Sequence, residues 1–209
     1  MERELKFLVK HAHIPTLPNG YHLGEPEPAL HLLDEYVDDR GQIRGAGWRL
    51  RRRRSDGIAM RYTLKSVRAA EDIGPLSERA EIEHAPSEGE EIPREILAAL
   101  KNGGVDVAHL GERLQSYLTL RQERLPIALF YGEIEVALLS IDEVRAQTPT
   151  PMMEQRWIEL EIEFLPTVAS EICDRVAIEL GAWLTSQPGV TAGGESKVDR
   201  AGRLLSISI

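Results

Sequence analysis

Acidic and basic side chains alternate with apolar residues along several stretches of this 209-residue sequence. Glu2, Glu4 and Lys6 share one face of the first stretch if it is a strand, because successive side chains of a strand point to opposite faces. A stretch near the other end has three acids at the same spacing: Glu159, Glu161 and Glu163. Clustered carboxylates of this kind suit divalent cations that prefer oxygen ligands, such as Mg²⁺ or Mn²⁺.

Basic residues follow the same alternation in the middle of the chain. One face of the expected strands has Arg51, Arg53, Arg61, Lys65 and Arg79, with the acids Glu81 and Glu83 and, from a later strand, Arg121. In an open antiparallel sheet such a face would lie in water. Like charges on one strand repel each other, however, and lysine and glutamate are poor strand formers. We therefore prefer an interpretation in which the charged faces are enclosed.

An enclosed face with both signs of charge needs a ligand that balances it, because unpaired buried charge is very costly. Guanidinium and ammonium groups bind phosphate oxygens, and clustered carboxylates bind divalent metals. A polyphosphate with a metal ion satisfies both halves at once. The four-arginine run 51–54 leaves open which pair faces inward, because a slip of one residue exchanges the two faces.

The elements that position these residues follow from periodicity and from turn signals. Strands are expected at residues 2–9, 30–39, 48–54, 58–67, 78–84, 113–124, 127–141 and 157–164, with breaks at Leu125-Pro126 and at Tyr131-Gly132. Helices are expected from Pro93 to Gly103 and from about Val168 to Trp183, where apolar residues form one stripe. Residues 11–28 and 145–155 are expected to be loops, and 193–197 a flexible tail segment. We expect one domain over residues 1–209.

Composition excludes several classes of protein. No apolar run approaches the roughly 20 residues that span a bilayer, and the N-terminus is charged, so we expect a cytoplasmic protein with no membrane partner. The net charge of −9 argues against nucleic-acid binding. Cys173, the only cysteine, falls on the apolar side of a predicted helix and is interpreted as packing. A metal site at His11 and His13 is less favoured than a polar loop.

The motif Glu2-x-Glu4-x-Lys6 resembles the ExExK signature of the CYTH, or triphosphate tunnel metalloenzyme, superfamily. Further matching pieces occur in the family's order: Tyr36-x-Asp38, Leu50-Arg51-Arg52-Arg53, Thr63-Leu64-Lys65, Arg79-x-Glu81-x-Glu83, Arg121, Ile141-Asp142-Glu143-Val144, the strand with Glu159 to Glu163, and Ser196-Lys197. Together these pieces cover nearly the whole chain, which makes the resemblance specific.

The resemblance implies an α+β, mainly β fold: an eight-stranded closed antiparallel β-barrel with flanking helices. The barrel would hold a triphosphate with one or two ions of Mg²⁺ or Mn²⁺. By position, the metal ligands would be Glu2, Glu4 and Glu161 with Glu159 or Glu163, and Asp142 would assist a second metal. The phosphate ligands would be Lys6, Arg51, Arg53, Lys65, Arg121 and Lys197, with Arg61, Arg79, Glu81 and Glu83 lining the tunnel.

The leading hypothesis is metal-dependent hydrolysis of inorganic tripolyphosphate or another small triphosphate, with Glu2, Glu4, Lys6, Asp142 and Glu161 as the catalytic set. Thiamine triphosphatase and class IV adenylate cyclase activities are alternatives. They differ from the leading hypothesis in requiring residues that contact the organic group of the substrate, and Tyr36, Trp48 and Trp157 are the candidates for stacking on a base or a thiazole ring. A third hypothesis is a non-catalytic module that binds polyphosphate or nucleotide. An RNA-binding patch at the arginine run is less favoured. The sequence leaves the oligomeric state open, a homodimer included.

Overall fold

The computed structural model describes residues 2–13, 16–67, 71–73, 76–79, 81–149 and 153–207; for residues 2, 71–73 and 76–79 it describes the backbone alone. The strands are β1 (Glu2–Val9), β2 (Tyr21–Pro26), β3 (Leu30–Asp38), β4 (Trp48–Ser55), β5 (Ile58–Ser66), β6 (Glu71–Ile73), β7 (Leu76–Arg79), β8 (Glu81–His84), β9 (Gln115–Tyr131), β10 (Ile134–Gln147), β11 (Glu154–Phe164) and β12 (Val190–Ala192). The helices are α1 (Gln42–Gly45), α2 (Arg94–Asn102), α3 (Leu110–Arg113), α4 (Ser170–Ser186) and α5 (Lys197–Leu205).

The described strands form one antiparallel sheet, and the expected closed eight-stranded barrel is wrong. Ten strands follow the order β6-β7-β1-β11-β10-β9-β3-β4-β5-β8, while β12 pairs with β1 and β2 pairs with β9. Among the described residues, no pairing joins the two ends of this order. Alternation indicated correctly which residues share a face, but it carries no information on whether the last strands of a sheet pair with each other.

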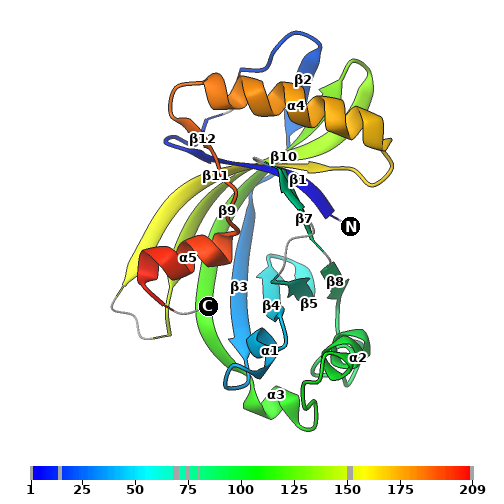
Figure 1. The fold of residues 1–209 in the computed structure, drawn as a ribbon, viewed down its shortest axis with the longest axis vertical. Coiled ribbons are helices and arrows are strands. Elements are labelled where there is room, and N and C mark those ends of the chain that lie inside the picture. Colours follow the sequence, from blue (N-terminus) through cyan, green and yellow to red (C-terminus); the bar gives the residue numbers. More distant parts are fainter. Residues whose placement is uncertain are drawn as a thin grey trace.

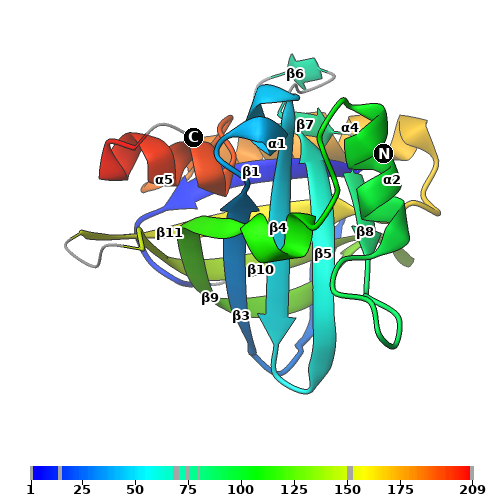
Figure 2. The same cartoon turned by 90° about the horizontal axis from the view of Figure 1, so that it is seen from below.

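The sheet is strongly curved, and helices lie on both of its faces (Figures 1 and 2). Helix α4 covers the outer face of β1 and β9–β11, where Leu5, Phe7 and Ile162 meet Val176 and Leu180. Helix α2 covers the outer face of β4 and β5 in a second apolar cluster. The apolar residues expected on the outer face are therefore buried by helices, which leaves the charged residues on the inner face.

Helix α5 lies on the inner side of the sheet and corrects the expectation of a flexible tail (Figure 1). Val198, Ala201 and Leu205 pack against Leu120 and Val144, which share the inner face of β9 and β10. Ser196 caps the helix by accepting a hydrogen bond from the backbone N–H of Asp199 at 3.2 Å. The sequence Ser-x-x-Asp is a signal for a helix start that the interpretation as a tail overlooked.

Two expected loops are shorter than predicted, and one expected break does not occur. Strand β2 occupies residues 21–26 of the loop expected at 11–28, and β10 and β11 extend into the loop expected at 145–155. Strand β9 continues through Pro126, which lies where the partner strand changes from β3 to β2. A residue without a backbone N–H is tolerated at such an irregularity. None of the helices described in the structure combines the length and hydropathy that crossing a membrane requires.

Candidate functional site

A cavity of about 260 Å³ lies on the inner face of the sheet, between β1, β3–β5, β8, β9, β11 and the start of α5. Its wall is almost entirely charged: Glu4, Lys6, Asp34, Arg49, Arg51, Arg53, Lys65, Glu81, Glu83, Arg124, Glu161, Glu163 and Lys197, with Tyr36, Ser66, Ser196 and Val198. The acids of the paired strands β1 and β11 form what we call the acidic side of the cavity, and the basic residues of the paired strands β4 and β5 form the basic side. Chain segments far apart in sequence therefore bring both signs of charge to one space.

The acidic side begins at the pairing of β1 with β11, where Lys6 and Glu161 are register partners. The ammonium nitrogen of Lys6 lies 2.7 Å from Oε1 of Glu4 and 4.0 Å from Oε1 of Glu161. Alternation along the two strands places all three side chains on the inner face, as the sequence predicted. Lys6 therefore already neutralises part of the charge of this carboxylate pair.

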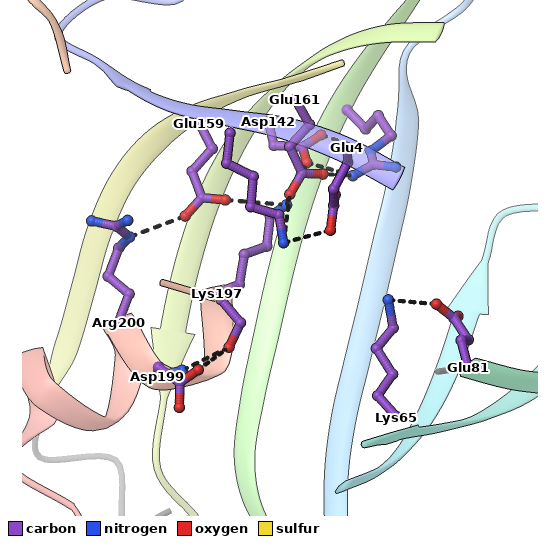
Figure 3. Close-up of polar contacts among 12 residues, drawn as sticks. Glu4, Lys65, Glu81, Asp142, Glu159, Glu161, Lys197, Asp199 and Arg200 are labelled. Carbon is purple, nitrogen blue, oxygen red and sulfur yellow. Dashed lines mark hydrogen bonds and ion pairs between the residues drawn. The ribbon is translucent and has the colours of Figure 1, made fainter. Parts of the chain in front are cut away.

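Lys197 is the first residue of α5, and its ammonium group contacts three carboxylates (Figure 3). Its Nζ lies 2.6 Å from Oε1 of Glu161, 2.9 Å from Oδ2 of Asp142 and 3.3 Å from Oε2 of Glu159. These carboxylates come from neighbouring positions of β10 and β11, where Asp142 and Glu159 are register partners. The capped start of α5 thus aims Lys197 at the point where the acids converge.

Arg124 on β9 binds two of the same acids from the other side. Its Nε and Nη2 donate to Oδ1 and Oδ2 of Asp142 at 2.7 and 2.6 Å, and Nη2 also donates to Oε2 of Glu161 at 2.7 Å. The Asp142 side chain is fully buried. Glu159 in turn accepts hydrogen bonds from Arg200 of α5 and from the indole of Trp157. A network of ion pairs thus holds the acidic side.

The ionisation of this network follows from its contacts. Burial acts to raise the pKa of Glu161, but the charges of Lys197, Lys6 and Arg124 outweigh it and hold that pKa well below its usual range. Burial acts to lower the pKa of Lys197, and the acids Asp142, Glu161 and Glu159 raise it instead. Glu161 is therefore a carboxylate, and Lys197 an ammonium, at neutral pH.

The basic side of the cavity is organised by Asp34 on β3. Arg53 donates to both oxygens of Asp34, at 2.7 and 2.8 Å, and Gln122 donates to Oδ2 at 2.7 Å. Arg51 lies 3.7 Å from the same carboxylate and donates to Oγ1 of Thr63 at 2.8 Å. Burial acts to raise the pKa of Asp34, yet the charge of Arg51 and the hydrogen bond from Arg53 lower it to about 2. The pair that faces inward is thus Arg51 and Arg53.

The far end of the basic side carries pairs between β5 and β8. Lys65 lies 2.8 Å from Oε2 of Glu81, and Arg61 lies 3.0 Å from Oε1 of Glu83. The Lys65–Glu81 pair is separate from the Lys197 network in the close-up of Figure 3. Of these two cations, Lys65 lines the cavity.

Most of the site residues predicted from sequence come together here. Glu4, Lys6, Arg51, Arg53, Lys65, Glu161, Glu163 and Lys197 line the cavity, and Asp142 and Glu159 lie directly behind Lys197. Glu2 and Arg79 are register partners in β1 and β7, but their side chains are outside the described part of the chain. Arg61 is exposed and reaches the cavity only through Glu83.

Arg121 is not brought to this site. It lies on the outer face of β9, exposed, beside Arg145 in a different surface hollow of about 470 Å³. The inner position belongs to Arg124. Residues 118, 120, 122 and 124 share one face, so alternation along the strand expected at 113–124 could have identified Arg124 for the inner face in place of Arg121. Alternation along β4 and β3 could also have identified Arg49 and Asp34 as inner-face residues. Arg200 could have been identified only if α5 had been recognised as a helix.

The carboxylates Glu4, Asp142, Glu159 and Glu161 are the ligand type that hard divalent cations prefer, so the donor chemistry fits Mg²⁺ or Mn²⁺. Oε2 of Glu159 is buried and accepts no hydrogen bond among the described residues; the contact it makes is the ion pair with Lys197 at 3.3 Å. In the described part of the chain, no three acidic, histidine or cysteine residues are already grouped to hold a metal ion. Lys6 and Lys197 stand between the acids instead.

Two solved structures have the same fold. A putative adenylyl cyclase from Hippeastrum, reported to have a dominant triphosphatase activity, is 18% identical; the match covers 100% of this chain and 98% of that one, with a TM-score of 0.59. The PH1819 protein of Pyrococcus horikoshii OT3 is 16% identical, with 96% and 97% covered and a TM-score of 0.50. No family model and no curated protein matches the sequence. The resemblance stated from the sequence motifs is confirmed at the level of the fold.

Proposed function

We propose that the chain belongs to the triphosphate tunnel metalloenzyme (CYTH) superfamily and hydrolyses a triphosphate with the help of Mg²⁺ or Mn²⁺. The substrate that we propose first is inorganic tripolyphosphate. The observation that carries this proposal is a cavity whose wall combines the carboxylates of β1 and β11 with the arginines and lysine of β4 and β5. A triphosphate with a divalent cation has the complementary arrangement of charge. The triphosphatase activity reported for the Hippeastrum protein of the same fold supports the same reaction class.

The basic side of the cavity would bind and orient the substrate. Arg51, Arg53 and Lys65 are held by Asp34 and Glu81, so they stand in place before a substrate arrives. Forked guanidinium groups bind phosphate oxygens at two points, and their charge stabilises the charge spread over the transferred phosphoryl group. Most of the catalytic effect is thus positioning and electrostatic stabilisation by residues fixed in advance.

The acidic side would hold the metal. Glu4 and Glu161, with Glu159 and Asp142 behind them, are the residues we assign as ligands, and Glu2 and Glu163 are the further candidates on the same strands. When bound, a divalent cation polarises phosphoryl oxygens and lowers the pKa of a water molecule. Lys6, which bridges Glu4 and Glu161 in the structure, is free to bind a phosphate oxygen once a cation neutralises those acids.

The wall of the cavity favours an inorganic substrate over one with an organic group. Among the described residues that line it, Tyr36 is the only aromatic one. Trp48 packs into the apolar cluster on the outer face beneath α2, and Trp157 packs beside α5 and donates to Glu159. Neither tryptophan is on the wall, so the stacking surface for a base or a thiazole ring that thiamine triphosphatase or cyclase activity would use is small.

The test is phosphate release from tripolyphosphate, thiamine triphosphate and ATP at equal concentration, with cyclic AMP measured alongside. We expect release from tripolyphosphate to be the fastest and cyclic AMP to be absent. Faster turnover of thiamine triphosphate, or cyclic AMP as the product, would replace the proposed substrate. Tight binding of tripolyphosphate without any phosphate release would instead identify the protein as a binding module.

A further inference from the structure

The ammonium group of Lys197 contacts three of the four carboxylates that we assign as metal ligands. Three carboxylates from β10 and β11 converge on it within 3.3 Å. Asp142 and Glu159 are almost completely buried and are absent from the cavity wall, which Lys197 and Glu161 line. Lys197 therefore separates these two carboxylates from the cavity, as Figure 3 shows for its side chain reaching from α5 to the acids.

We propose that Lys197 is a competitor of the divalent cation, occupying the carboxylates until a triphosphate draws its ammonium group away. This inference rests on the proposed function and adds to it a coupling between the two ligands. Metal and triphosphate bind with positive cooperativity, because each favours the arrangement in which Lys197 contacts phosphate oxygens and the carboxylates contact the metal.

The charge of the network supports this exchange. Asp142, Glu159 and Glu161 carry three negative charges, and Lys197, Arg124 and Arg200 contact them with three positive ones. Lys6 also lies 4.0 Å from Glu161, and its charge is matched by Glu4 at 2.7 Å, so the set stays balanced. A divalent cation added to this balanced set would leave uncompensated positive charge in a buried place, which is costly. Departure of the Lys197 ammonium lowers that excess, and a polyanion in the adjoining cavity gives the ammonium a new partner.

The side chain of Lys197 can make this movement while α5 stays in place. Helix α5 is fixed by contacts that do not involve Lys197: its apolar residues pack on β9 and β10, and Asp199 accepts hydrogen bonds from Arg49 at 2.5 and 3.1 Å. The four-carbon stem of lysine is flexible and its ammonium rotates freely, unlike the guanidinium of Arg124, which is fixed at two points on Asp142. Lys197 can therefore leave, and of the two lysines of the site it is the one whose ammonium contacts Asp142 and Glu159.

The experiment measures equilibrium binding of each ligand alone to the full-length protein. Mn²⁺ binding is followed by titration calorimetry and by the electron paramagnetic resonance signal of the free ion, without triphosphate; tripolyphosphate binding is measured in chelator. We expect Lys197→Gln to bind Mn²⁺ about tenfold more tightly than wild type and tripolyphosphate about tenfold more weakly, within the usual range of coupling between sites. A merely structural role of Lys197 would not shift the two affinities in opposite directions.

Two further variants complete the test. Lys197→Arg keeps the positive charge and should bind Mn²⁺ as weakly as wild type. Arg203→Gln removes an exposed charge of the same helix, paired with Glu195, and should change neither affinity. Equal or weaker Mn²⁺ binding by Lys197→Gln would overturn the competition while leaving the proposed function intact. Absence of Mn²⁺ binding in every variant, with and without tripolyphosphate, would overturn the proposed metal dependence and this inference with it.

Discussion

Arg124 and Asp142 face each other across β9 and β10 as register partners and are joined by two hydrogen bonds of 2.7 and 2.6 Å. Asp142 is fully buried, so this two-point contact supplies the compensation that its charge needs inside the protein. The same guanidinium binds Glu161, and it links the two acidic strands behind the cavity. Arg124 therefore has the structural position that the sequence motif suggested for Arg121.

Exchange of these two arginines for glutamine distinguishes them. Arg124→Gln should lower the free energy of unfolding by about 3 kcal/mol, because it leaves Asp142 buried without its main partner, and should weaken tripolyphosphate binding. Arg121→Gln should change stability by less than about 0.5 kcal/mol, as expected for an exposed residue. Urea unfolding and binding titrations on both variants make the comparison. A larger effect at position 121 would show that the site has been placed on the wrong face of β9.

Asp34 should make the stability of the protein depend on pH in the acid range. Its pKa is about 2 in the folded protein, below its ordinary value of 3.8, so the unfolded chain takes up the proton first as the pH falls. The stabilisation it provides, about 2 kcal/mol, is therefore fully present above pH 4 and is lost as the pH falls toward 2. Asp34→Asn should be less stable than wild type at pH 7, and the difference should shrink toward pH 2. Glu123→Gln, on the outer face, serves as the control; a constant difference across the range would contradict the assignment.

The Arg49–Asp199 pair should hold α5 against the sheet. Asp199→Asn removes the charge that Arg49 contacts at 2.5 Å, so the amides of residues 197–205 should exchange with deuterium faster, whereas those of α4 should not change. Arg203→Gln breaks only an exposed pair and should leave exchange unaltered. Unchanged protection of α5 in Asp199→Asn would mean that apolar packing alone fixes the helix.

Lys65 should contribute to substrate binding and little to folding. It stands on the basic side of the cavity, paired with Glu81 and partly exposed. Lys65→Gln should raise the KM for tripolyphosphate about tenfold, the loss of roughly one charge-assisted contact, while the melting temperature stays within a few degrees. Lys101→Gln, an exposed substitution on α2, is the matched control. A loss of stability with an unchanged KM would assign Lys65 to the fold alone.

Much of the inner face could be predicted from the sequence because alternation along a strand determines which side chains share a face. This reasoning placed Glu4, Lys6 and Lys65 on one side before the strands were known to be neighbours, and it left open which pair of the run 51–54 joins them. It worked because each of these strands has an apolar opposite face that must be covered, and because a clear turn signal separates the strands that contain Arg51, Arg53 and Lys65.

The rest depended on long-range pairing or on local signals that competed with one another. Pro126 suggested the end of a strand, yet β9 continues because its partner changes at that point. The glycines at 193 and 194 suggested a flexible tail. The capped start of α5, which positions Lys197, was therefore not predicted. Closure of the sheet, which was predicted wrongly, depends on how strands distant in sequence meet, and no local pattern encodes this.

The central claim is that the protein is a metal-dependent triphosphatase whose metal is held by the acids of β1, β10 and β11. One assay on the wild type and two variants tests this claim most directly. Phosphate release from tripolyphosphate is measured with Mg²⁺, with Mn²⁺ and with excess chelator, for wild type, Glu161→Gln and Glu143→Gln. Glu143 lies on the outer face of β10 next to Asp142 and is exposed, so its substitution is the matched control. We predict release that chelator abolishes in wild type and Glu143→Gln, and a rate at least about a hundredfold lower in Glu161→Gln. Release that persists in chelator, or that survives the loss of Glu161, would contradict the account.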